Sequence, residues 1–161
     1  MVKRVLVLLV VIAALFVGYG MLRGGSSPGA TVQTSSGYTY QPPKGWPHKA
    51  PCDRHPFTGT GHADDGCTRP DLAADGGAYF VSYPVAAGRT TADVVNELTV
   101  QVAGYRSCTG EGGCLRNVAH PDQRGDLHVQ IINHRAVAML CLRTDVFDVA
   151  RGCDVAWNTV H

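Results

Sequence analysis

The chain is divided by one apolar segment: Val5–Leu22 carries no charge, and all six cysteines lie beyond it. As a helix, these 18 residues extend roughly 27 Å at about 1.5 Å per residue, close to the hydrocarbon thickness of a bilayer. Lys3 and Arg4 precede the segment and Arg23 follows it, a charge bias that favours a cytoplasmic N-terminus. We therefore expect a single transmembrane helix that places the cysteines on the oxidising side of a membrane.

A cleaved signal peptide is the alternative for this segment. The apolar core of a signal peptide is usually about 7 to 15 residues long and is followed by small residues at the cleavage site. Here the core is longer, Gly18-Tyr19-Gly20 is a poor cleavage site, and Ser27–Ala30 is a marginal one. These features favour a retained signal anchor over residues 1–23, with a cytoplasmic stub and an extracytoplasmic remainder in the cell membrane.

Composition separates a tether from a domain after the apolar segment. Residues 24–37 are rich in Gly, Ser and Thr and hold almost no large apolar side chain, which predicts a flexible linker. Residues 38–161 then provide enough chain for one domain with a single core. The expected organisation is thus anchor, linker and one extracytoplasmic domain.

The predicted domain is nearly neutral. It holds 11 of the 14 Lys and Arg residues and all 13 Asp and Glu residues, a net charge of −2. No basic block occurs along the sequence that would bind nucleic-acid phosphates or an anionic lipid surface, so we expect no nucleic acid as a partner. Arginine outnumbers lysine and aspartate outnumbers glutamate, a composition that the codon bias of a GC-rich bacterium would produce.

Six cysteines, an even number in an exported domain, predict structural disulfides. Sequence alone leaves many pairings open, and spacing favours nearest neighbours in the chain. No C-x-x-C pair occurs, the spacing that thiol oxidoreductases and zinc knuckles typically use, so redox catalysis is the less favoured role. The favoured pairs are Cys52 with Cys67, Cys108 with Cys114, and Cys141 with Cys153, the last joining two strands.

Strand patterns predominate in the domain. Alternating residues, many of them aromatic or β-branched, mark several short segments, and Asn133-His134-Arg135 separates two of them as a hairpin turn would. The predicted strands are Gly37–Gln41, Ala78–Val85, Leu127–Ile132, Val137–Leu142 and Cys153–Val160.

Helix signals are confined to one segment. Thr90 and Asp93 have the spacing of a capping box, and Val94 and Leu98 follow at helical spacing. Lys49–Gly77 shows no sustained period and is dense in Gly, Pro, Asp and His, so we expect a long surface loop there. The predicted fold class is α+β: a small disulfide-stapled domain with a mostly antiparallel sheet and one main helix.

The start of the domain carries a resemblance. Tyr38-Thr39-Tyr40-Gln41 leads into Pro42-Pro43-Lys44-Gly45-Trp46, and a strand, a helix and a meander follow. This order resembles PsbP/Mog1-like extracytoplasmic domains, which often open with a strand and a Pro-x-Gly-Trp turn, although the cysteine-bearing loop departs from that pattern. The resemblance implies an α/β/α sandwich used as a binding or assembly-accessory module, and it carries over no catalytic residues.

Two imidazoles and two carboxylates form the strongest candidate for a metal site: His55, His62, Asp64 and Asp65. Zinc could use both histidines and one aspartate, and calcium could use the aspartate pair with backbone carbonyls. Neither EF-hand spacing nor H-E-x-x-H is present, and polar loops of this composition are commonly solvated turns. Both interpretations stay open.

No catalytic arrangement accompanies these residues. Ser82 lies within a strand pattern, without a nucleophile elbow around it, and an even set of disulfides leaves no cysteine nucleophile. We therefore expect no cofactor and a membrane-anchored extracytoplasmic module that binds a protein of the envelope, as an accessory subunit of a larger membrane complex. The alternative is a metal-dependent enzyme that uses His55, His62, Asp64 and Asp65 with zinc or calcium.

Overall fold

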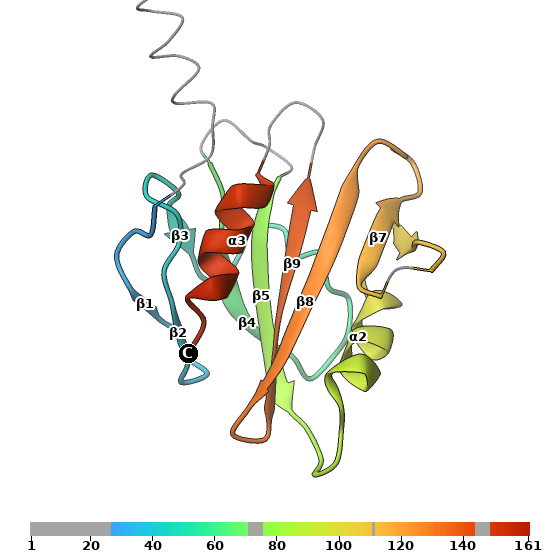
Figure 1. Ribbon diagram of the computed structural model, residues 1–161, viewed down its shortest axis with the longest axis horizontal. Helices are drawn as coiled ribbons and strands as arrows, with labels where there is room; N and C mark the ends of the chain where they lie inside the picture. The colour runs from blue at the N-terminus through green and yellow to red at the C-terminus, as the bar shows by residue number, and fades with distance from the viewer. Residues whose placement is uncertain (1–26, 71–75, 111, 144–148) are drawn as a thin grey trace, which may run out of the picture.

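A seven-stranded antiparallel sheet organises the structure, a computed structural model that describes residues 27–70, 76–110, 112–143 and 149–161 (Figure 1). The strand order is β3-β4-β5-β9-β8-β7-β6, and β1 and β2 form a separate two-stranded sheet. The strands are β1 Val32–Gln33, β2 Thr39–Tyr40, β3 His48–Lys49, β4 Ala63–Thr68, β5 Gly77–Pro84, β6 Tyr105–Ser107, β7 Cys114–Asn117, β8 Arg124–Ile132 and β9 Arg135–Arg143, and the helices are α2 Thr91–Thr99 and α3 Ala150–Asn158.

The predicted transmembrane segment, Val5–Leu22, lies outside the described residues. Within the described ranges, no helix combines the length and the apolar character that crossing a bilayer requires.

The hairpin of β8 and β9 is the longest pairing in the sheet, and it confirms the hairpin predicted from the sequence. Leu127 pairs with Leu140, and Ile132 pairs with Arg135 beside the turn. Asn133 and His134 form this turn with φ angles of 50° and 60°, a left-handed conformation that Asn and His adopt more readily than most residues.

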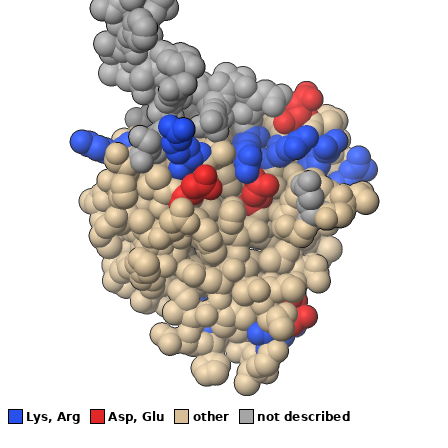
Figure 2. Space-filling view, viewed as in Figure 1, with Lys and Arg blue, Asp and Glu red and all other residues tan. Residues whose placement is uncertain are grey.

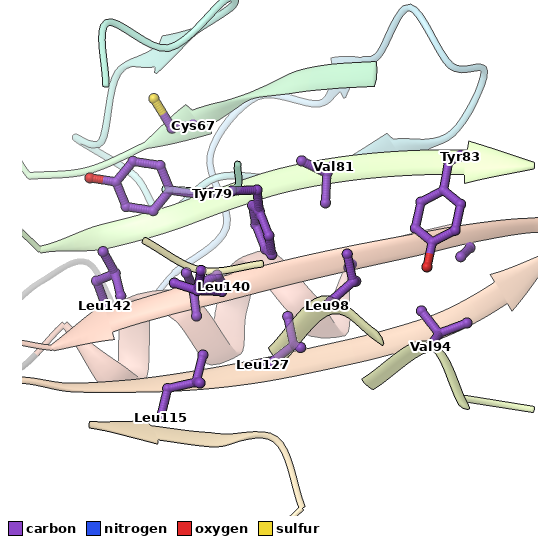
Figure 3. Close-up of a cluster of buried hydrophobic side chains, with 14 residues drawn as sticks. Cys67, Tyr79, Val81, Tyr83, Val94, Leu98, Leu115, Leu127, Leu140 and Leu142 are labelled. Atoms are coloured by element: carbon purple, nitrogen blue, oxygen red, sulfur yellow. The ribbon is translucent and has the colours of Figure 1, made fainter. Parts of the chain in front are cut away.

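Helix α2 begins where its capping box predicts. The Thr90 hydroxyl accepts a hydrogen bond from Asp93 N at 3.2 Å, and the Asp93 carboxylate accepts one from Thr90 N at 2.9 Å. Val94 and Leu98, one turn apart, are fully buried against the sheet, where they join the cluster of Leu115, Leu127 and Leu140 (Figure 3). We call this side of the sheet the α2 face.

The second helix corrects one prediction: Cys153–Val160 lies largely in α3 and does not form a strand. Cys153 and Ala156 lie three apart on one face of the helix, and Val160, just beyond its end, joins the same buried cluster, although a short apolar pattern alone does not separate helix from strand. Gly152 admits the Trp46 ring, since a Cβ at this position would overlap the ring atom Cζ2.

Two buried clusters show that the sheet is covered on both faces. Phe80, Val137 and Met139 point toward α3, and their neighbours in sequence point toward α2. Helix α3 crosses one face in Figure 1, with α2 behind the other. The result is an α/β/α sandwich, as the PsbP/Mog1-like resemblance implies. The sequence predicted one main helix, and the described residues contain a second, α3.

The long surface loop predicted over Lys49–Gly77 is also partly wrong, because it contains the six-residue strand β4. Its sequence, Ala63 to Thr68, lacks the regular alternation of a strand because the register shifts at a bulge between Asp64 and Gly66. Gly66 has a φ of 100°, and a Cβ there would lie 2.6 Å from the Lys49 carbonyl oxygen, so only glycine fits.

The linker predicted over residues 24–37 is folded from Ser27 onward. Lys44 N donates to the Ser27 carbonyl at 2.8 Å, and Gly29 N donates to the Pro42 carbonyl at 2.7 Å. Val32 then pairs with Tyr40 in the small sheet. Backbone pairing holds this segment on the domain in spite of its Gly- and Ser-rich composition, so the folded part begins before the predicted boundary at residue 38.

Three disulfides join nearest neighbours in the chain: Cys52–Cys67, Cys108–Cys114 and Cys141–Cys153. This is the pairing that spacing favours. The last bridge joins β9 to helix α3, whereas the sequence predicted a link between two strands.

Candidate functional site

The structure divides the four residues predicted as metal ligands. His55 Nε2 lies 3.5 Å from Asp64 Oδ1, so these two side chains meet on the α2 face. The Asp64 carboxylate also accepts hydrogen bonds from Cys52 N at 3.1 Å and Gly66 N at 2.9 Å. These amide donors hold the carboxylate in the loop that the Cys52–Cys67 bridge closes, a structural role that needs no metal.

His62 is on the same face but packs against Tyr83 of β5. Its ring centroid is 4.5 Å from that of Tyr83, and burial lowers the pKa of the imidazole below its ordinary value. The neutral form that this favours packs against the tyrosine ring.

Asp65, the bulged residue of β4, is 2 % exposed. Its Oδ1 accepts a hydrogen bond from the Ser36 hydroxyl at 2.5 Å. Burial, and then the adjacent Asp65 carboxylate, raise the pKa of the Tyr38 phenol. The bulge thus directs Asp65 away from its neighbour Asp64 and into contact with residues 36 and 38.

The described part of the chain contains no group of three or more His, Cys, Asp or Glu side chains that could hold a metal ion. The structure brings His55 and Asp64 together and leaves His62 and Asp65 apart from them.

A different group of candidate side chains lies at the end of the sheet where β9 ends. Arg106 pairs with Arg116, Arg116 with Arg124, and Arg124 with Arg143, across the four strands β6, β7, β8 and β9. Residues directly opposite each other in an antiparallel sheet project from the same face. We call these four residues the arginine row.

The arginine row projects from the face that carries α3. Arg143 follows Cys141 by two residues on β9, and Cys141 is bonded to Cys153 of the helix. Figure 2, which views this face, shows Lys and Arg side chains gathered in a band along one end of the molecule. We call this end the arginine end, and all four members of the row are exposed there.

Like charges directly opposite each other destabilise a sheet, so the row is unfavourable for folding. Asp126 forms an ion pair with Arg143. Among the residues that the structure describes, Arg106, Arg116 and Arg124 make no side-chain ion pair or hydrogen bond. Exposed guanidinium groups without a described partner are free donors that an external anion could neutralise, so the row is a candidate binding surface.

A cavity of about 530 Å³ lies against the row. Its lining combines three guanidinium groups with the hydroxyls of two short polar residues and with the Cys108–Cys114 bridge. The lining residues are Arg106, Ser107, Cys108, Thr109, Cys114, Arg116 and Arg124. Guanidinium and hydroxyl donors of this type bind phosphate or carboxylate oxygens.

Sequence reasoning missed the row because it looked for a run of adjacent cations. The signal that could have found it is symmetry about turns: Arg124 and Arg143 are equidistant from the Asn133-His134 turn, which the sequence does predict. Since opposite residues of a hairpin lie side by side, cations placed symmetrically about a turn become neighbours on folding.

Comparisons with known proteins give a likeness of fold. No protein-family model matches the sequence, and no curated protein matches it. Among solved structures, the chain is similar to the solution structure of cyanobacterial PsbP (CyanoP) from Synechocystis sp. PCC 6803, with a TM-score of 0.47, 14% identity, and coverage of 85% of this chain and 97% of the other. The PsbP-like resemblance noted in the sequence is thus found in the fold as well, and at this level it carries no argument about function.

Proposed function

We propose that this protein is a single-pass, membrane-anchored extracytoplasmic binding module that serves as an accessory subunit of an envelope complex. Val5–Leu22 supplies the anchor, and the sandwich supplies the binding surfaces. The observation that carries the proposal is the arginine row, in which like charges lie directly opposite one another and have the donors to bind an anionic group.

The covalent construction supports an extracytoplasmic location. All six cysteines form disulfides, which persist in oxidising compartments and are rare in the cytosol. The protein would therefore depend on export for its bridges to form.

Capture of the full-length protein from detergent-solubilised membranes tests the proposal. We expect the chain to remain in the membrane fraction after alkaline carbonate extraction and to co-purify with an envelope protein in a fixed ratio. A chain recovered from the cytosol with free thiols would contradict the proposal.

A metal-dependent enzyme built on His55, His62, Asp64 and Asp65 makes a different prediction. It requires zinc or calcium at a fixed ratio in the purified protein, lost in the His62→Ala variant. Elemental analysis of both proteins separates this alternative from the binding module.

A further inference from the structure

We infer that the arginine row binds the anionic phospholipid headgroups of the membrane that anchors the chain, so that the arginine end of the sandwich faces the bilayer. This inference rests on the proposed function, since it requires the anchor at Val5–Leu22. It adds the ligand class and the orientation of the domain.

The tether is short. The described part of the fold starts at Ser27, and residues 23–26 lie between it and the end of the predicted span. Between the Cα atoms of Leu22 and Ser27 a fully extended chain covers at most about 18 Å. The headgroup layer on one side of a bilayer is itself about 5 to 8 Å deep. The tether therefore keeps Ser27 close to the membrane surface.

Ser27 is held near the start of α3 by a chain of contacts. Its carbonyl accepts the hydrogen bond from Lys44 N, two residues before Trp46. The Trp46 ring packs on Gly152 in the first turn of α3, and the Trp46 carbonyl accepts a hydrogen bond from the Thr68 hydroxyl at 3.3 Å.

Thr68 lies in a cross-strand line with Ala78 and Cys141, two residues from Arg143. Ser27 and the arginine row thus lie at the same end of the sheet, and in Figure 1 the dark blue start of the described chain lies at this end. A short tether that holds Ser27 at the bilayer also holds the row there.

The side chains of the row have the chemistry of a phosphate-binding surface. Arginine binds phosphate oxygens through two parallel N–H donors, and an exposed cation near an anionic leaflet is attracted to it. Four strands spaced about 4.8 Å apart place the guanidinium groups along roughly 14 Å. A row of that length suits an extended anionic surface, whereas a single small anion would occupy only the cavity beside Arg106, Arg116 and Arg124.

Asp126 is the acidic partner of the row among the described residues. Five further acidic residues belong to segments that the structure does not describe: Asp71, Asp75, Glu111, Asp145 and Asp148. The experiment therefore includes a state in which lipid supplies no negative charge, so that pairing within the chain is measured separately.

Arginine-specific modification by phenylglyoxal tests the inference on the full-length protein. The protein is reconstituted in lipid nanodiscs of phosphatidylcholine alone or with phosphatidylglycerol, and modification at each arginine is measured by mass spectrometry. We expect Arg116 and Arg124 to react several-fold more slowly in the anionic discs. Arg89, at the other end of the domain, is the internal control and should react equally in both.

Two further arms identify the ligand. Glycerol phosphate added to phosphatidylcholine discs should leave Arg116 reactive if the ligand is a bilayer surface, and protection by this soluble phosphate alone would assign the cavity to a small anion. In Arg116→Gln/Arg124→Gln, protection of Arg106 and Arg143 should weaken by roughly fivefold per removed charge. The matched control, Arg89→Gln, should leave their protection unchanged.

The inference fails if Arg116 reacts equally in both kinds of disc, or if it is already unreactive in neutral discs, which would place its countercharge within the chain. Protection that appears only with a captured protein partner would also overturn it. Failure of the proposed function looks different, because the chain would then not remain in the discs.

Discussion

The two ends of the sheet differ in how their charged side chains are paired. At the arginine end, four like charges lie directly opposite one another, and only Arg143 has a described acidic partner. At the hairpin end, where Asn133 and His134 form the turn, Arg89 is paired with Glu97, and Arg135 donates to the Ser82 hydroxyl at 3.3 Å. At the hairpin end these cations are paired within the fold, whereas at the arginine end Arg106, Arg116 and Arg124 have no partner among the described residues.

The disulfides follow the same division. Cys114 and Cys141 lie in one cross-strand line through Asp126, two residues from the arginine row, and Cys67 lies one residue further into the sheet. All three bridges therefore stand in the half of the sheet next to the row. We infer that the disulfides stabilise the end where like charges lie opposite each other. The hairpin end is held by backbone pairing and side-chain packing.

Removing a bridge should have the largest effect on this comparison. Cys141→Ala/Cys153→Ala should lower the free energy of unfolding by about 3 kcal/mol, and Cys108→Ala/Cys114→Ala by about 2 kcal/mol, because the second bridge closes a shorter loop. Urea denaturation measures both. Hydrogen exchange in Cys108→Ala/Cys114→Ala should accelerate in β6 and β7 and stay unchanged at the hairpin turn; uniform acceleration would contradict the division between the ends.

Filling the space at Gly152 should have the next largest effect. Gly152→Ala places a Cβ against the Trp46 ring, which anchors the N-terminal segment at the arginine end, and such overpacking typically costs about 1–3 kcal/mol. Gly112→Ala is the control, because a Cβ there has no neighbour within 4 Å. Thermal denaturation should separate the two variants, and equal melting temperatures would show that the contact is not tight.

Neutralising one arginine at each end should change stability in opposite directions. Arg116→Gln should raise the free energy of unfolding by up to about 1 kcal/mol, since it relieves two like-charge pairs. Arg89→Gln should lower it by at most about 1 kcal/mol through loss of the pair with Glu97. Both effects should shrink at 1 M salt, where the Debye length is about 3 Å. Loss of stability in Arg116→Gln would mean that the row has a structural role.

The smallest expected effect concerns pH. Burial, the largest cause, lowers the pKa of His128, whose ring lies 5.5 Å from that of Trp157 on α3. The unfolded chain then takes up a proton at a pH where the folded state stays neutral. The contribution of the neutral His128 ring to the free energy of unfolding is therefore fully present above the ordinary histidine pKa of about 6.5, and it is lost as the pH falls below that value. His128→Gln should flatten the decline in stability between about pH 7 and pH 5, and an unchanged slope would contradict this assignment.

More of the fold than of the candidate site could be predicted from the sequence. Capping at Thr90 and Asp93 and the turn at Asn133-His134 are local signals, so α2 and the β8–β9 hairpin could be predicted. Strand β4 could not, because its bulge at Asp65 breaks the alternation that identifies a strand.

The arginine row shows a different limit. Neighbours in the row are separated by up to 19 positions in the chain, between Arg124 and Arg143, and a net charge of −2 over the predicted domain conceals them. Only the register of four strands brings them together. The reverse effect occurs at Asp64 and Asp65, neighbours in the sequence whose side chains one bulge sends in different directions.

The most direct test of this account is the ratio of phenylglyoxal modification at Arg116 to that at Arg89 in the full-length protein. If the arginine row binds anionic lipid headgroups and Arg89 is paired within the fold, this ratio falls several-fold when phosphatidylglycerol is added to phosphatidylcholine discs. A ratio that stays the same in both lipids would contradict the account.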